Sequence, residues 1–196
     1  PWLDPDHRLS ATPDGIESDC RMDPLAQEIL LFWLGTTDLT AEIERRDIWF
    51  RSTPEFDQYL TTTYTETHER AVGGGLDHLK HTTAECLGLI IALDQFPRNI
   101  FRRSPRSFGG DAKAREIVHH ALDQGYDQGL HKWARTFFYL PFEHSEHLAD
   151  QERGVELYGS LDDERSLASS EAHCAAVRRF GRFPHRNAVL GRQSTA

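Results

Sequence analysis

The sequence has no long apolar run. The longest one, Leu87 to Leu93, is interrupted by Gly88 and is far too short to cross a bilayer as a helix. The chain also does not open with the basic and then apolar segments of a secretory signal. These two absences predict a protein that has no membrane partner and works in the cytoplasm.

Cysteine and positive charge are also scarce. The three cysteines, Cys20, Cys86 and Cys174, form no Cys-x-x-Cys pair, and their number is odd, which argues against both a zinc knuckle and a disulfide framework. The formal net charge of -9 argues against nucleic acid as a partner, because the phosphate backbone attracts basic proteins.

The usual signatures of cofactor and nucleophile sites are missing as well. The sequence contains no P-loop, no Gly-x-Gly-x-x-Gly and no Gly-x-Ser-x-Gly. It therefore predicts no cofactor. The alternating apolar and polar residues of β-strands are also absent, which leaves an all-α fold.

Helix signals, in contrast, repeat along the chain. Asp23-Pro24 and Thr53-Pro54 each place a capping residue before a proline at the first helical position. Gly35 and the run Gly73 to Gly75 end these two helices. We expect a short helix over 40–49 and a last long helix over about 163–180.

The second half of the chain has its own start and stop signals. The apolar run 83–96 is predicted to form a central buried helix that ends at Pro97. Leu140-Pro141 is expected to break the helix that begins near residue 128. Asp111 and Ser145 are predicted N-caps of the two helices that follow them.

These signals predict about seven antiparallel helices in one domain, residues 23–196. Helix pairs of this size can stack as in a tetratricopeptide array, although no strict repeat period is visible. Residues 1–22 are rich in proline, aspartate and serine and are predicted to form an irregular arm.

Two polar segments, residues 93–102 (LDQFPRNIFR) and 179–195 (RFGRFPHRNAVLGRQST), echo each other. In both, a Phe-Pro step is soon followed by an Arg-Asn pair. A guanidinium fork matches the geometry of carboxylate and phosphate groups, so two such turns facing each other would clamp a small anion. In the alternative, both turns are purely structural, and their Arg and Asn side chains hold the loops in place by bonding to backbone carbonyls. The predicted ligand-binding residues are Gln95, Arg98, Asn99, Arg102, Tyr139, Arg182, His185, Arg186 and Asn187.

A third segment, residues 137–151, concentrates titratable groups. Glu143, His144 and Glu146 are predicted to act in general acid/base catalysis. No metal site is predicted, since neither His-Glu-x-x-His nor a second Glu-x-x-His is present. The alternative is a buried salt-bridge network.

Asp94 joins the catalytic candidates, because it stands at the end of the most apolar helix. A buried carboxylate without a partner is costly, and the expected partner is Arg98 or an arginine of residues 179–195. A purely structural ion pair stays open as the alternative.

These motifs, together with LFWLG at 31–35, Trp49-Phe50 and Phe56-Asp57, resemble the bacterial "domain of unknown function 924" family. The resemblance runs from about Leu25 to Thr195, and the motifs occur in the same order and spacing. It implies an all-helical fold similar to the tetratricopeptide-like superhelix, and no particular activity. Since the family pattern usually continues past the last Ser-Thr, it also implies a further C-terminal helix.

Two functions follow from these observations. In the first, the polar residues line a pocket for a small anionic metabolite, and a cofactor-free acid/base reaction such as hydrolysis takes place there. In the second, the fold is a tetratricopeptide-like interaction module whose arginines grip a peptide partner. The sequence does not decide the oligomeric state.

Overall fold

The computed structural model describes residues 21–194, and within this range the fold is all-α, as predicted, with no strand. A π-helical turn, Ile91–Gln95, joins α3 and α4 without a break, so the eight α-helices form seven continuous segments. The helices are α1 (Pro24–Leu34), α2 (Pro54–Val72), α3 (Thr83–Ile90), α4 (Phe96–Ile100), α5 (Asp111–Asp123), α6 (Lys132–Glu143), α7 (Leu148–Tyr158) and α8 (Glu164–Phe180). The superhelical array and the single domain over 23–196 stay predictions, and nearly all of the predicted arm lies outside the described residues.

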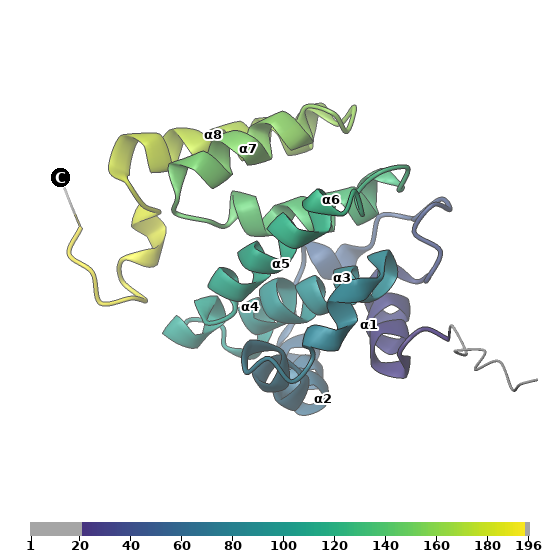
Figure 1. Ribbon diagram of the computed structural model, residues 1–196. Coiled ribbons are helices and arrows are strands. Elements are labelled where there is room, and N and C mark those ends of the chain that lie inside the picture. The colour runs from purple at the N-terminus through teal and green to yellow at the C-terminus, as the bar shows by residue number, and fades with distance from the viewer. Residues whose placement is uncertain (1–20, 195–196) are drawn as a thin grey trace, which may run out of the picture.

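The helices pack in layers from α2 to α8 (Figure 1). The α3–α4 segment is central: α3 contacts α1, α5 and α6, and α4 contacts α2. α6 contacts α7, and α7 lies against α8 at the opposite edge from α2. Within residues 21–194, no helix has both the length and the hydropathy needed to cross a membrane.

The predicted ends of three helices are confirmed. Asp23 and Thr53 cap α1 and α2 by accepting hydrogen bonds from backbone N–H groups of the first turn. Asp163 caps α8 in the same way. Gly35 and Gly181 follow α1 and α8 in the left-handed conformation, at φ 81° and 67°, where glycine carries no steric penalty.

The sequence predicted that Pro97 ends the central helix, and this prediction was wrong. The helix continues through Pro97 because the turn before it is π-helical. The N–H of Phe96 bonds to the carbonyl of Ile91, five residues back. Pro97 has no N–H to offer Leu93, and the Leu93 carbonyl instead faces Gly110, so closely that a Cβ at Gly110 would lie 2.2 Å from it. The helix thus continues to Ile100, with Asp94 and Gln95 on the π turn. Such turns often occur at functional sites.

Four other local predictions were wrong. Residues 40–49 form only a 3₁₀ turn, Asp47–Trp49, and Pro141 lies inside α6, where the packing of its buried last turn outweighs one lost hydrogen bond. Neither predicted cap occupies the cap position, because α5 begins at Asp111 itself and α7 begins at Leu148, after His147. The Asp111 carboxylate binds arginines, and the Ser145 hydroxyl donates to Asp150 at 2.7 Å and accepts from the His147 N–H at 3.1 Å.

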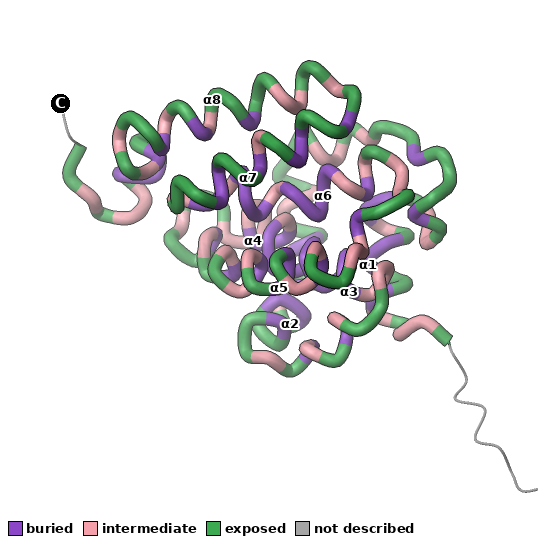
Figure 2. The backbone as a smooth tube through the Cα atoms, turned by 45° about the horizontal axis from the view of Figure 1, so that its top comes forward, coloured by how far each residue is buried: buried purple, intermediate pink, exposed green. Residues whose placement is uncertain are grey.

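Aromatic side chains connect the core to one side of the molecule. Phe96 packs against Tyr64 and Trp33, with ring centroids 4.5 and 5.6 Å apart. Trp33 also contacts Phe137, which contacts Trp49 at 5.0 Å. Figure 2 shows the buried residues in the inner helices and mostly exposed turns along α8. The aromatic chain therefore leads from the core to the pocket described next.

Candidate functional site

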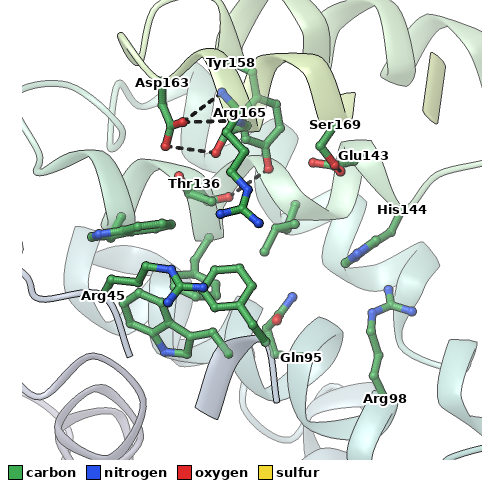
Figure 3. Close-up of a pocket in the computed structure, with 16 residues that line it drawn as sticks. Arg45, Gln95, Arg98, Thr136, Glu143, His144, Tyr158, Asp163, Arg165 and Ser169 are labelled. Carbon is green, nitrogen blue, oxygen red and sulfur yellow. Dashed lines mark hydrogen bonds between the residues drawn. The ribbon is translucent and has the colours of Figure 1, made fainter. Parts of the chain in front are cut away.

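A pocket of about 460 Å³ lies between α6, α8, the π turn and the segment around the 3₁₀ turn Asp47–Trp49. Its volume is in the range of small-molecule sites. One part of its wall is aromatic and apolar and another is polar, as the close-up shows (Figure 3). The lining residues are Arg45, Trp49, Phe50, Gln95, Arg98, Trp133, Thr136, Phe137, Leu140, Glu143, His144, Tyr158, Asp163, Arg165, Ser166 and Ser169.

The polar wall contains a buried Asp–His pair. Asp94, on the π turn, is fully buried, and His144 follows the end of α6. Nδ1 of His144 lies 2.9 Å from both carboxylate oxygens of Asp94. Burial alone would raise the pKa of Asp94, but the positive charge of Arg98 and the bond to His144 outweigh it and hold this pKa below its ordinary value. Asp94 is therefore ionised, and Nδ1–H of His144 donates to it.

This hydrogen bond fixes the orientation of the imidazole ring. His144 lines the pocket, and its side chain is 18% exposed. Among residues 21–194, no group bonds to its other ring nitrogen, Nε2. A histidine whose Nδ1–H is held by a buried carboxylate presents Nε2 as a proton acceptor. The pair is therefore able to act as a general base toward the pocket.

Of the two predicted partners for Asp94, Arg98 and an arginine of residues 179–195, it is Arg98 that donates to Asp94, at 2.7 Å. The same nitrogen lies 3.0 Å from Asp111, and Arg186 reaches the other oxygen of Asp111 at 3.3 Å. Burial raises the pKa of Asp111, which the charge of Arg98 partly offsets. The two Phe-Pro turns thus do meet, and the carboxylate between their arginines is the protein's own Asp111.

Arg186 is buried, with 7% of its surface exposed. Its guanidinium lies between the rings of Phe108 and Phe183, at 4.5 and 4.7 Å from the ring centroids. Burial lowers its pKa, with Asp111 opposing the shift. Arg186 is not among the residues that line the pocket, and in the structure it ties residues 183–192 to α5.

Of the two remaining catalytic candidates, Glu143 lies in the pocket lining and Glu146 lies outside it. Glu143 lines the pocket and is buried; Ser169 donates to it at 2.8 Å, and His173 lies 3.1 Å away. Glu146 accepts from the Phe183 N–H at 2.9 Å and from Arg192 at 2.7 Å, so it holds the C-terminal segment and lies outside the pocket lining.

Several predicted ligand-binding residues are engaged elsewhere. Asn99 and Arg102 both donate to Asp57, at 2.8 and 2.6 Å. Partial burial alone would raise the pKa of Asp57. The hydrogen bonds from Arg102, Ser52 and Asn99 outweigh this effect and lower the pKa to about 2. Tyr139 is buried and donates to Asp127 at 2.7 Å. These contacts lie outside the pocket lining.

The C-terminal candidates also lie outside the pocket lining. Arg182 donates to the Gln193 carbonyl at 2.6 Å, and Asn187 is buried. His185 is exposed and packs on the Phe183 ring, with centroids 5.4 Å apart. Of the residues predicted to bind ligand, the pocket therefore contains Gln95 and Arg98.

Several of the residues that line the pocket were not predicted from the sequence. Trp49, Phe50 and Trp133 look like core residues in the sequence, and Arg45 and Arg165 look like surface charges. Only the tertiary fold brings them together, and no local pattern identifies them. Among the described residues, no three histidine, cysteine, aspartate or glutamate side chains are grouped closely enough to hold a metal ion.

Comparisons with known proteins agree with this fold. The profile of the family described as "Bacterial protein of unknown function (DUF924)" matches residues 29–196. A solved structure of a protein of unknown function from Agrobacterium tumefaciens is 36% identical, with a TM-score of 0.79, and the match covers 87% of this chain and 92% of that one. No curated protein matches the chain. Because the family profile spans most of the sequence and the solved relative shares both sequence and fold, the chain belongs to the DUF924 family of bacterial proteins.

Proposed function

We propose that this protein is a cofactor-free hydrolase that binds a small anionic molecule in the pocket and uses His144 as its general base. The observation that carries the proposal is the buried Asp94, which holds Nδ1–H of His144, a residue that lines the pocket and whose Nε2 has no partner among residues 21–194. Buried carboxylate–histidine pairs of this kind activate water or hydroxyl nucleophiles in many hydrolases.

In the proposed hydrolysis, His144 transfers one proton from the attacking water to the leaving group. Nε2 of His144 accepts a proton from a water molecule as the water oxygen bonds to the electrophilic centre of the substrate. The bond to the leaving group then breaks, and Nε2–H returns the proton to the leaving group. Asp94 stabilises the imidazolium in between, and the positive charge of Arg98 in the pocket wall favours the negative charge that develops on the substrate.

Glu143 is the second titratable group of the pocket wall. Ser169 and His173 hold its carboxylate, so it is oriented but has acceptor capacity left. We assign it a positioning role, in which it accepts a hydrogen bond from the substrate or from the attacking water.

The proposal is tested first by a thermal-shift screen against small carboxylated and phosphorylated molecules, since ligands of the native state raise the melting temperature. Esters and amides of each hit are then assayed for hydrolysis with the wild type and the variant His144→Gln. We expect His144→Gln to bind the hits but to hydrolyse their esters or amides about 10²–10⁴-fold more slowly, the usual contribution of a general base.

The matched control is His147→Gln. This histidine lies three residues further along the chain and is exposed outside the pocket lining, so the substitution should leave hydrolysis unchanged. Full turnover in His144→Gln would refute the role of His144. A panel without any thermal shift would contradict small-anion binding and favour the peptide-interaction alternative.

A further inference from the structure

A second pair of cations borders the same pocket, away from the Asp94–His144 pair. Arg45 comes from the segment before the 3₁₀ turn Asp47–Trp49, and Arg165 from the first turn of α8. Their side chains extend from different elements toward the same part of the pocket (Figure 3).

The carboxylates nearest to these arginines are already engaged or distant. Asp163 caps α8, accepting from the N–H groups of Arg165 and Ser166 at 3.1 and 3.2 Å. Arg45 forms an ion pair with the exposed Asp47, but the 3.6 Å between Nη1 and Oδ1 is too long for a hydrogen bond, and an exposed pair of this kind contributes little.

The guanidinium of Arg165 has no ion pair within residues 21–194. This contrasts with Arg98, which bridges two carboxylates at the other end of the pocket. Arg165 thus has no counter-charge among these residues, and Arg45 has only that of the exposed Asp47, so the charges of both arginines favour an anion bound between them.

The wall between the two ends of the pocket is aromatic. The ring of Trp49 contacts Trp133 and Phe137, with centroids 5.1 and 5.0 Å apart. The Arg45 guanidinium lies 4.2 Å from the centroid of Phe50, which is 56% exposed. Such surfaces bind flat apolar groups by stacking and edge contacts.

We infer that the ligand is a flat, apolar molecule with a carboxylate or phosphate at one end, which Arg45 and Arg165 hold. This inference rests on the proposed function, because it takes the bond to be hydrolysed to lie at the opposite end, beside His144. The arginine pair would then set which anions enter, and the aromatic wall would set the orientation of the substrate.

The test is isothermal titration calorimetry with three probes that share one ring system: 1-naphthyl phosphate, 1-naphthoate and the uncharged 1-naphthol. The titrations use the His144→Gln background, in which we expect hydrolysis of a probe to be strongly slowed. We expect both anions to bind more tightly than 1-naphthol, and the ranking of the two identifies the preferred oxyanion. Arg45→Gln and Arg165→Gln should each weaken anion binding roughly tenfold or more, because each removes a charge-assisted hydrogen-bond donor.

The control variant is Arg153→Gln, an exposed arginine on α7 that pairs with Glu156 outside the pocket lining. It should bind all three probes as the parent does, and affinity for 1-naphthol should be the same in every variant. Equal anion affinity in the parent and the Arg45→Gln/Arg165→Gln double variant would overturn the inference, as would anions that bind no better than 1-naphthol. Neither result bears on the loss of hydrolysis in His144→Gln, so the two proposals fail separately.

Discussion

The Asp94→Ala variant should lose about 3–5 kcal/mol of unfolding free energy, the usual cost of removing one partner from a buried ion pair. Asp94 is fully buried, and its carboxylate accepts from Arg98 at 2.7 Å and from His144 at 2.9 Å. Without it, Arg98 keeps only Asp111, and the side-chain amide of Gln95 also loses its acceptor. Urea unfolding followed by circular dichroism measures the difference.

An exposed ion pair gives the comparison for this result. Glu152 pairs with Arg178 at 3.0 Å, and both side chains are more than half exposed. Glu152→Ala should therefore change the unfolding free energy by less than about 1 kcal/mol. If Asp94→Ala were as mild as Glu152→Ala, Asp94 would not be the centre of a buried network. Should Asp94→Ala fail to fold, the isosteric Asp94→Asn gives a measurable, smaller loss in the same direction.

Gly110→Ala should destabilise the fold by about 3 kcal/mol, at the upper end of the usual cost of overpacking. An added Cβ would lie 2.2 Å from the Leu93 carbonyl oxygen and 3.1 Å from the His68 ring. This oxygen belongs to the backbone of the buried central helix, so it cannot shift as the end of a flexible side chain could. The strain would fall on the turn that carries Asp94 and Gln95, so we expect ligand binding to weaken together with stability.

Gly159→Ala is the matched substitution at a glycine with room. Gly159 ends α7 at φ -59°, and its added Cβ would meet nothing closer than 3.4 Å. We expect a change within about 1 kcal/mol, with a slight gain in stability as the favoured direction. If Gly110→Ala unfolded at the same urea concentration as Gly159→Ala, Gly110 would not be packed tightly against the Leu93 carbonyl, and the account of this contact would be wrong.

The sequence predicted helices best where the signal was local. Asp23 and Thr53, both predicted caps, cap their helices with their own side chains, so a few neighbouring residues determine each start. Prediction failed where tertiary packing overrides a local preference. Pro97 and Pro141 both lie within helices, since a π turn accommodates one and the buried last turn of α6 the other.

The same distinction explains the site predictions. Asp94 stood out because a buried carboxylate needs a partner, and His144 because residues 137–151 concentrate titratable groups. The similarity of residues 93–102 and 179–195 also pointed to Arg186. No sequence pattern near these residues indicated that the carboxylate of Asp111 would pair with both Arg98 and Arg186. Arg45 and Arg165 are separated widely in the sequence, and only the fold brings them to one pocket.

The central claim is that Asp94 fixes the proton of His144 on Nδ1 and leaves Nε2 as the base that faces the pocket. Long-range ¹H–¹⁵N correlation spectra of the imidazole rings test it directly at about pH 8, where free imidazole is neutral. The resonances of His144 are those that disappear in His144→Gln. We predict a protonated Nδ1 and an unprotonated Nε2 for this ring. A proton on Nε2 with a bare Nδ1 would contradict the account, because Asp94 would then be the proton donor and no base would face the pocket.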